Sequence, residues 1–237
     1  MKNRQKLVAL TGAGISAESG INTFRGSGGL WEEYDIMEVA SIDGWHKNPE
    51  LVQRFYNDRR KQLGEVEPNV AHCILAELEK YFDITVVTQN VDNLHERAGS
   101  TKIVHLHGEM TKARSFDNPE LIVDIEYRAI EPNEKASDGS QLRPHIVWFG
   151  EMVPMIEPAM KIVSEADILV IIGTSLNVYP AAGLINYAKK NIPVFLIDPE
   201  TINWRGREIK QIRTKATLGM EILKEILLDI LTSDPSK

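Results

Sequence analysis

The sequence predicts an α/β fold, a doubly wound parallel sheet with a second, smaller lobe of helices and loops. Apolar, β-branched runs of strand length recur along the 237 residues without polar alternation, as expected for strands that are covered on both faces. Helical segments separate these runs, which is the order of a parallel sheet with crossover helices. Polar and small residues directly follow several runs, at the sheet edge where such folds bind ligands.

Four runs are predicted to be strands of this sheet: residues 7–10, 84–88, 168–172 and 194–197. Between the first two, residues 69–81 are predicted to be helical, because Ile74 and Leu78 then share one face. A helical stretch over residues 181–190 precedes the fourth strand, and an amphipathic helix over residues 220–231 closes the chain.

Two segments interrupt this alternation and are predicted to form the smaller lobe. Residues 27–68 follow the first strand as an insertion of helices and loops, and residues 109–143 are polar and rich in turn sequences. The remaining segments are predicted to form the large domain: residues 1–26, 69–108 and 144–237.

The composition excludes several classes of protein. The net charge of −7 disfavours nucleic-acid binding, which needs a basic face, and no apolar stretch is long enough to span a membrane. The single cysteine, Cys73, excludes an intrachain disulfide and a cysteine-rich zinc cluster. We therefore expect a cytoplasmic monomer that binds neither nucleic acid nor membranes.

The first predicted strand runs into a glycine-rich turn. Gly12 and Gly14 let the backbone approach a phosphate closely, although such turns also serve as simple strand-to-helix connections. The spacing Gly12-x-Gly14-x-x-Ala17 fits a dinucleotide fingerprint. Glu32 and Glu33 do not end a second strand as the ribose-binding acid should, so the pattern favours NAD binding more than hydride transfer.

Polar residues also follow the second and third predicted strands. Gln89, Asn90 and Asp92 come after the second, where they could contact a ribose or a nicotinamide. Asn90 or Asp92 could equally serve as a helix N-cap. Residues 173–175, Gly-Thr-Ser, follow the third strand and could meet a phosphate or ribose, or form a structural turn.

Two histidines, His105 and His107, stand two residues apart in an extended segment, which places both imidazoles on one side. A neutral imidazole in a cleft suits general-base catalysis near pH 7. The pattern predicts one catalytic and one structural histidine, without deciding which is which.

Seven segments in a fixed order carry a family resemblance: Gly12-Ala13-Gly14-Ile15-Ser16, Thr23-Phe24-Arg25-Gly26, Gly29-Leu30-Trp31, Thr88-Gln89-Asn90-Val91-Asp92, His105-Leu106-His107-Gly108, Val147-Trp148-Phe149-Gly150-Glu151 and Gly173-Thr174-Ser175. With them the chain resembles the sirtuin family, the NAD-dependent protein-lysine deacylases, from about residue 7 to residue 220. The resemblance implies a Rossmann-type NAD-binding domain beside the smaller lobe.

The resemblance also implies a reaction. NAD would be the co-substrate, and acylated-lysine proteins or peptides would be the partners. The acyl-lysine oxygen displaces nicotinamide from NAD, and His107 acts as the base that activates a ribose hydroxyl, with His105 in a structural role. Water then releases lysine and O-acyl-ADP-ribose, while Asn90 and Asp92 position the nicotinamide ribose and carboxamide.

The NAD contacts implied by the resemblance lie in the turns and at the strand ends. The expected set is Gly12, Ala13, Gly14, Ile15, Ser16, Ala17, Glu18, Phe24, Arg25, Trp31, Gln89, Asn90, Val91, Asp92, Gly173, Thr174, Ser175, Asp198, Pro199, Glu200 and Ala216. Phe24 and Arg25 would shield and orient the reacting centre. Asp198 stands where the family usually has Asn, and either side chain can accept a hydrogen bond from a ribose hydroxyl.

Substrate contacts are expected from two further segments. Val147, Trp148 and Phe149 would pair with the substrate peptide as an added strand, or form an ordinary buried strand. Tyr56 and Arg59 share a helix face and match the Tyr-x-x-Arg pattern of sirtuins that accept succinyl and malonyl groups. Outside this family context, Arg59 would be a solvated arginine on an amphipathic helix. We expect desuccinylase and demalonylase activity beside deacetylase activity.

The chain departs from the family where most sirtuins bind structural zinc through two cysteine pairs. Residues 114–143 contain neither cysteine nor histidine, so we expect no metal site. A small apolar core is expected in its place, formed by Leu121, Ile122, Val123, Ile125 and Ile130.

Two alternative functions remain open on the same fold. One is ADP-ribosyl transfer to protein or plain NAD hydrolysis, which would consume NAD without an acyl peptide. The other is a non-catalytic, NAD-sensing module, suggested by the missing zinc ligands and disfavoured by the presence of Asn90 and His107.

Overall fold

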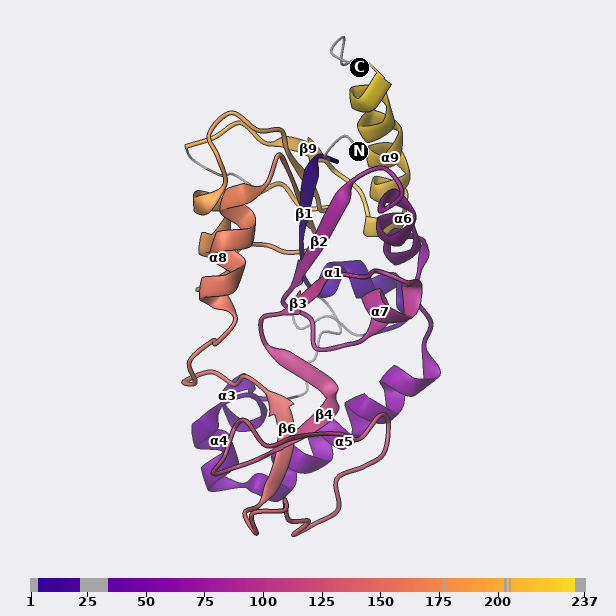
Figure 1. The fold of residues 1–237 in the computed structure, drawn as a ribbon. Helices are drawn as coiled ribbons and strands as arrows, with labels where there is room; N and C mark the ends of the chain where they lie inside the picture. The colour runs from indigo at the N-terminus through magenta and orange to yellow at the C-terminus, as the bar shows by residue number, and fades with distance from the viewer. Residues whose placement is uncertain (1–3, 22–33, 177, 203, 205, 233–237) are drawn as a thin grey trace.

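The computed structural model describes residues 4–21, 34–176, 178–202, 204 and 206–232. Two groups of elements lie one above the other in Figure 1: a parallel sheet between helices, and a smaller group of helices with an antiparallel sheet. Among the described residues, no helix is both long and apolar enough to cross a membrane.

The large sheet has six parallel strands in the order β3-β2-β1-β7-β8-β9. Their bounds are β1 (Lys6–Thr11), β2 (Asp83–Thr88), β3 (Ile103–His105), β7 (Ile168–Ile172), β8 (Val194–Ile197) and β9 (Lys210–Ile212). Strand order reverses at β1, which pairs with β2 on one side and β7 on the other. This confirms the predicted doubly wound α/β fold and creates a ligand-binding switch point at the carboxyl ends of these three strands.

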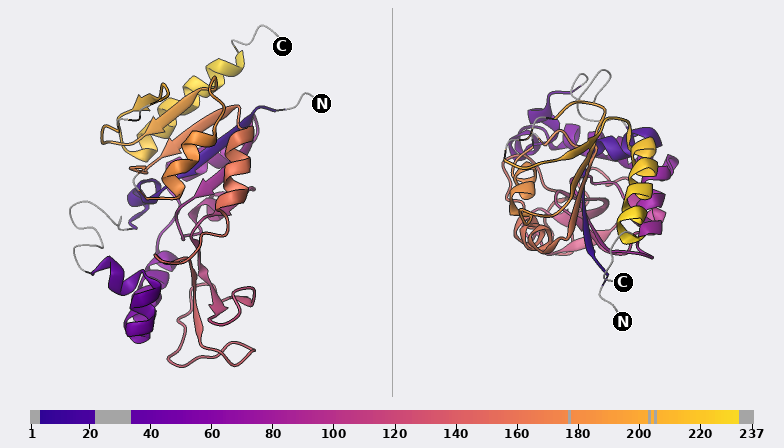
Figure 2. Two further views of the ribbon diagram at one scale, coloured as in Figure 1. Left: turned by 90° about the vertical axis from the view of Figure 1, so that its left-hand side faces the viewer. Right: turned by 90° about the horizontal axis from the view of Figure 1, so that it is seen from above.

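Helices cover both faces of this sheet, as the view from above in Figure 2 shows. Side chains of β7 alternate between the two cores: Ile168 and Val170 pack with α6 (Val70–Leu78) and α9 (Ala216–Thr232). Leu169 and Ile171 pack with α8 (Ile156–Glu165) and the 3₁₀ helix η2 (Ala181–Tyr187). Double-sided burial explains why these strands read as continuous apolar runs.

The predicted helices are present with shifted limits. Helix α6 begins after Asn69, whose side chain accepts a hydrogen bond from the N–H of Ala71, and it ends before residue 81. Helix α9 begins at Ala216, about one turn earlier than predicted. The stretch predicted to be helical over residues 181–190 is a 3₁₀ helix that ends at Tyr187.

The smaller group combines helices with an antiparallel sheet of order β5-β4-β6. The elements are α3 (Ile36–Val39), α4 (Ile42–Lys47), α5 (Pro49–Glu65), β4 (Gly108–Ser115), β5 (Ile122–Asp124) and β6 (Leu142–Ile146). Met110 of β4 and Ile146 of β6 share a core with Trp45 and Phe55 of the helices. The sequence indicated only polar, turn-rich loops here, because Lys112 and other charged residues obscure the strand alternation.

A small apolar core supports this antiparallel sheet, as expected for Ile125 and Ile130, which are buried against neighbouring strand residues. Leu121 packs against their edge. The expectation was wrong for Ile122 and Val123, which are 42% and 39% exposed on the edge strand β5.

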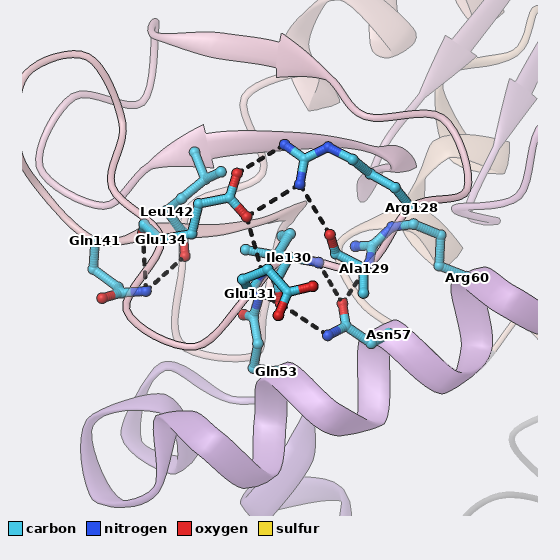
Figure 3. A network of polar contacts seen from close by, with 10 residues as sticks. All are labelled: Gln53, Asn57, Arg60, Arg128, Ala129, Ile130, Glu131, Glu134, Gln141 and Leu142. Atoms are coloured by element: carbon cyan, nitrogen blue, oxygen red, sulfur yellow. Dashed lines mark hydrogen bonds and ion pairs between the residues drawn. The ribbon is translucent and has the colours of Figure 1, made fainter.

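Helix α5 holds the loop at Ile130 through a polar network (Figure 3). The Asn57 side chain donates to the carbonyl of Ile130 at 3.0 Å and accepts from its N–H at 3.0 Å. Arg60 donates to the same Asn57 oxygen at 2.7 Å and to the carbonyl of Met110 at 2.6 Å. On the far side of the loop, Arg128 forms a two-point ion pair with Glu134. The bonds of Asn57 and Arg60 attach the loop and strand β4 to helix α5.

Candidate active site

The turns after β1 and β7 meet backbone to backbone at the switch point. Gly14 donates from its N–H to the carbonyl of Gly173 at 2.9 Å, and Gly12 does the same to Ile172 at 3.0 Å. A Cβ on Gly14 would lie 2.6 Å from the Cα of Gly173, and one on Gly173 would lie 2.4 Å from the nitrogen of Ile15. Gly173 also has a φ of +60°. Only glycine fits this contact.

A buried polar network fills the space between this turn and the end of β2. Asn90 donates to the carbonyl of Gly12 at 3.2 Å and to Ser16 Oγ at 3.1 Å. Ser16 in turn donates to Asp92 Oδ2 at 3.0 Å, and the Leu94 N–H donates to Oδ1 at 3.2 Å. Burial raises the pKa of Asp92, and these two donors oppose the rise. The N-cap of the following helix α7 (Leu94–Ala98) is Asn93, so the N-cap interpretation is wrong for both Asn90 and Asp92. Asp92 lies just before this cap, and Asn90 donates toward the turn after β1.

The two histidines differ in their partners. His107 Nδ1 lies 2.9 Å from the carbonyl oxygen of Gln89, which can only accept, so Nδ1 carries the hydrogen and Nε2 has the lone pair. Burial lowers the pKa of His107, which keeps its ring neutral at pH 7. This is the form that a general base requires.

His105 has an acceptor at each ring nitrogen. Nδ1 lies 2.9 Å from the carbonyl oxygen of Asn90, and Nε2 lies 2.7 Å from the Glu96 carboxylate. Burial acts to lower the pKa of His105, but Glu96 outweighs it and the pKa is raised. His105 is therefore suited to hold the segment in place as a cation, and His107 to accept a proton.

A pocket beside the Asn90 network is lined by residues from both groups of elements. It is lined by Ala13, Ser16, Ile21, Arg59, Gln62, Leu63, Asn90, Val91, Asp92 and Met110. Helix α5 thus contributes Arg59 to a pocket that also contains predicted NAD-binding residues. Burial lowers the pKa of Arg59, and the nearby Asp92 carboxylate opposes this effect.

Tyr56, one helical turn before Arg59, contacts the segment after β6. Its hydroxyl oxygen accepts from the Trp148 indole N–H at 3.1 Å. Trp148 lies over the Arg143 guanidinium, at 3.4 Å from the ring centroid to Cζ. Arg143 donates to both carboxylate oxygens of Glu151, at 2.6 and 3.0 Å.

The main chain of the expected peptide-binding segment is paired within the protein. The Trp148 N–H donates to Glu151 at 2.8 Å, and the Phe149 N–H donates to the carbonyl of Ala40 at 2.9 Å. The Ile42 N–H donates to the carbonyl of Phe149 at 3.1 Å. These bonds connect the segment after β6 with the start of α4.

This arrangement was compared with known proteins. The model of the Sir2 family matches residues 12–180. The chain belongs to the Sir2 family. The NAD-dependent protein deacylase of Bacteroides thetaiotaomicron is 56% identical over 234 residues, covering 96% of this chain and 99% of that protein. The NAD-dependent protein deacylase of Helicobacter pylori strain J99 is 51% identical over 238 residues, covering 100% of both.

Solved Sir2 structures share this fold over nearly the whole chain. A mutant Sir2 homologue in complex with ADP ribose has a TM-score of 0.88 at 38% identity, covering 98% of this chain and 95% of that one. A Sir2 homologue in complex with NAD has a TM-score of 0.84 at 39% identity, covering 96% of this chain and 91% of that one. The sirtuin resemblance of the sequence is thereby confirmed.

Several residues expected to bind NAD in this Sir2 chain lie around the same edge of the sheet. Thr174 follows β7 and accepts from Gln89 Nε2 at 3.1 Å, which joins the ends of β7 and β2. Val91 accepts from the Met110 N–H through its carbonyl at 2.7 Å. Ser175 lies half-buried beside Thr174.

Other expected contacts are placed differently. Ile15 is buried in the core below the turn, whereas Ala17 is exposed in the 3₁₀ helix η1 (Ala17–Ser19). The Glu18 carboxylate accepts from the N–H and the hydroxyl of Thr217 in the first turn of α9, at 3.0 and 2.9 Å. Glu18 therefore stabilises the start of α9, next to the buried Ala216.

Asp198 directly follows β8, where its carboxylate accepts from the N–H of Glu200 at 2.9 Å. Burial raises the pKa of Asp198. Pro199 and Glu200 are exposed. Phe24, Arg25 and Trp31 lie outside the described residues.

The sequence did not indicate a pair of buried histidines behind the Sir2 site. The rings of His72 and His95 are 4.9 Å apart. His72 accepts from the Asn69 N–H at 3.3 Å, and its Nε2 lies 3.5 Å from Ser16 Oγ. Asn69 and His72 have the three-residue spacing of a capping box, a signal that the sequence does contain.

We expect His72→Gln to reduce the pH dependence of stability. Burial lowers the pKa of His72 to about 4, so the unfolded chain binds an extra proton as the pH falls below 6.5. The contribution of His72 to the free energy of unfolding is therefore fully present above this pH and is lost as the pH falls. Gln can still accept from the Asn69 N–H as the third residue of a capping box.

Urea unfolding at pH 7 and pH 5 measures the effect. The loss of stability between these conditions should be about 2 kcal/mol smaller in His72→Gln than in the unmodified protein, because about 1.5 pH units of this range lie between the unfolded pKa of 6.5 and pH 5. Equal losses in both proteins would show that His72 is not buried as a neutral ring.

Proposed function

We propose that this protein is an NAD-dependent protein-lysine deacylase that transfers the acyl group from lysine to ADP-ribose. The observation that carries the proposal is the placement of His107, with an unprotonated Nε2, next to the buried segment of Asn90 and Asp92 at the switch point of a Sir2 fold. Relatives that are 56% and 51% identical over nearly their whole length carry the name NAD-dependent protein deacylase.

NAD binding is assigned to the turns after β1, β2, β7 and β8. The glycine contact between Gly14 and Gly173 leaves bare backbone at the switch point, where a pyrophosphate can approach closely. Asn90 and Asp92 line the neighbouring pocket, where the amide of Asn90 and the carboxylate of Asp92 could bind a ribose and a carboxamide. Phe24 and Arg25 belong to the same proposal through the family motif alone.

Within this mechanism His107 accepts a proton from a ribose hydroxyl through Nε2. Its neutral state follows from burial, and the Gln89 carbonyl supports the imidazolium that forms, because Nδ1–H continues to donate to it. Ser16 and Asn90 hold the Asp92 carboxylate and each other in one orientation. The protein thus supplies orientation and one base, while the energy comes from the glycosidic bond of NAD.

The acyl pocket is assigned to Arg59 and Tyr56, and with it a preference for succinyl and malonyl groups. Arg59 lines the pocket that contains Asn90 and Asp92. A guanidinium at this position could bind the carboxylate of an acidic acyl group through two parallel hydrogen bonds. The substrate peptide is assigned to the segment at Val147 and Phe149, where the Phe149 side chain is exposed.

We also propose that the smaller lobe folds without zinc. Structural zinc needs about four nitrogen or sulfur ligands, and residues 114–143 offer none. The residues present therefore do not fit the metal site of the family. The polar network at Asn57 and the core around Ile130 supply the attachment instead.

The proposed function is tested by incubating the enzyme with NAD and acetyl-, succinyl- and malonyl-lysine peptides of one sequence. Mass spectrometry should detect the matching O-acyl-ADP-ribose with each peptide. His107→Ala should lower turnover by about 100-fold or more, because general-base catalysis contributes roughly that factor. His46→Ala, at an exposed histidine of α4, is the control.

Two outcomes contradict the proposal. NAD consumption at the same rate without any acyl peptide would indicate an NAD hydrolase, and ADP-ribose attached to protein would indicate a transferase. Absence of product with every acyl peptide, despite NAD binding, would indicate a sensing module.

Arg59→Met should reduce kcat/KM for the succinyl peptide about 10-fold to 100-fold more than for the acetyl peptide. The estimate corresponds to the loss of hydrogen bonds from a charged donor. Arg54→Met, at an exposed arginine of the same helix, should not change the ratio of the two activities. Comparable desuccinylation by Arg59→Met and the unmodified enzyme would refute the assignment of the acyl pocket.

Asn57→Ala should lower the free energy of unfolding by about 2 kcal/mol, because the Ile130 N–H and one N–H of Arg60 lose the Asn57 oxygen as acceptor. Asp58→Ala, at the neighbouring exposed position, should change it by less than about 0.5 kcal/mol. A chelator should not shift the unfolding midpoint of the unmodified protein. Stoichiometric zinc in the purified protein would contradict the zinc-free lobe.

A further inference from the structure

The hydrogen bond between Trp148 and Tyr56 determines which way the Tyr56 hydroxyl can act. An indole N–H only donates, so the Tyr56 oxygen accepts at the 3.1 Å contact. Both side chains are buried, with 2% and 5% of their surfaces exposed. A phenol that accepts from one side keeps its own hydrogen for an acceptor elsewhere.

Tyr56 also keeps that hydrogen over the working pH range. Burial raises the pKa of Tyr56 to about 12, although the Trp148 donor and the Arg59 charge oppose the rise. Tyr56 and Arg59 are three residues apart on α5, so their side chains lie on the same side of the helix. A carboxylate bound by Arg59 would therefore meet a phenol that donates.

The indole that fixes this orientation is itself held on several sides. The Arg143 guanidinium stacks on its face at 3.4 Å, and Arg143 is anchored by both oxygens of Glu151. Glu151 also accepts from the Trp148 backbone N–H at 2.8 Å. The Trp45 ring packs against the Trp148 indole at a centroid distance of 5.2 Å. Rotation of the indole away from Tyr56 would break its ring contacts with Arg143 and Trp45.

We infer that Trp148 is a positioning residue for acyl-group specificity: its indole N–H orients the Tyr56 hydroxyl as a donor toward acyl groups that end in a carboxylate. An acetyl group has no terminal acceptor, so it gains nothing from this orientation. The inference rests on the proposed deacylase function and deepens its assignment of the acyl pocket. It gives the indole a role separate from any contact with the peptide backbone.

The test compares Trp148→Phe with the unmodified enzyme on succinyl- and acetyl-lysine peptides of one sequence. Phe keeps an aromatic ring for Arg143 and removes the N–H. The KM for the succinyl peptide should rise about fivefold more than the KM for the acetyl peptide, as the loss of one neutral hydrogen bond predicts. Damage to the fold would change both alike and leave their ratio unchanged.

A double-mutant cycle with Tyr56→Phe separates the indole N–H from other effects of the substitution. In the Tyr56→Phe enzyme, Trp148→Phe should cause no further change in the succinyl-to-acetyl ratio. An unchanged ratio in Trp148→Phe, or the same fall with and without the Tyr56 hydroxyl, would overturn the inference alone. An unmodified enzyme that deacetylates but has no desuccinylase activity would overturn the acidic-acyl assignment together with it.

An NMR measurement tests the hydrogen bond without turnover. The four tryptophans give four indole N–H signals, and the one absent in Trp148→Phe belongs to Trp148. This signal should shift in Tyr56→Phe, and addition of succinyl peptide should move it more than addition of acetyl peptide. An indole N–H signal of Trp148 that does not shift in Tyr56→Phe would contradict the proposed contact.

Discussion

The close approach of two backbone turns is the constraint on which the site depends. Gly14 and Gly173 leave no space between the ends of β1 and β7 for even a Cβ atom, and the N–H of one donates to the carbonyl of the other. The turn after β1 is thereby held over the sheet edge, where Gly12 and Ser16 reach Asn90 from the end of β2. Thr174, next to Gly173, adds a link to Gln89. Substituting either Gly14 or Gly173 would separate the turns and release the side chains that they align.

Hydrogen-bond partners, rather than residue types, distinguish the polar groups of this site. His105 and His107 have the same side chain two positions apart, yet Glu96 raises the pKa of His105 while burial lowers the pKa of His107. The Gln89 carbonyl holds the His107 hydrogen on Nδ1 and leaves Nε2 unprotonated. The same logic applies to Tyr56, whose donor direction is decided by Trp148. Buried polar groups must be paired, and each pairing selects a tautomer or a hydroxyl orientation. The chemistry of the site is therefore decided by neighbours in space.

This explains which features could be predicted from the sequence. Strands β1, β2, β7 and β8 could be predicted because both of their faces are apolar. The residues that follow them lie at one edge of the sheet, because the strands are parallel. Strands β4 and β6 were not predicted, because their charged residues serve partners such as Glu151. The local pattern did not distinguish His105 from His107, since it does not reveal a partner such as Glu96, and only the family resemblance assigned their roles. Contacts between residues 56 and 148 span 92 positions, beyond the reach of any periodicity.

Helix α5 contacts both the loop at Ile130 in the smaller lobe and the proposed acyl pocket. Asn57 and Arg60 hold the loop at Ile130 and strand β4, while Tyr56 and Arg59, on the neighbouring side of the same turns, face Trp148 and the pocket. A helix is stiff over these few residues, so a displacement of the loop moves both pairs together. The loop's own backbone bonds to the helix, so the stability of the lobe and the placement of the proposed acyl-binding side chains depend on the same contacts.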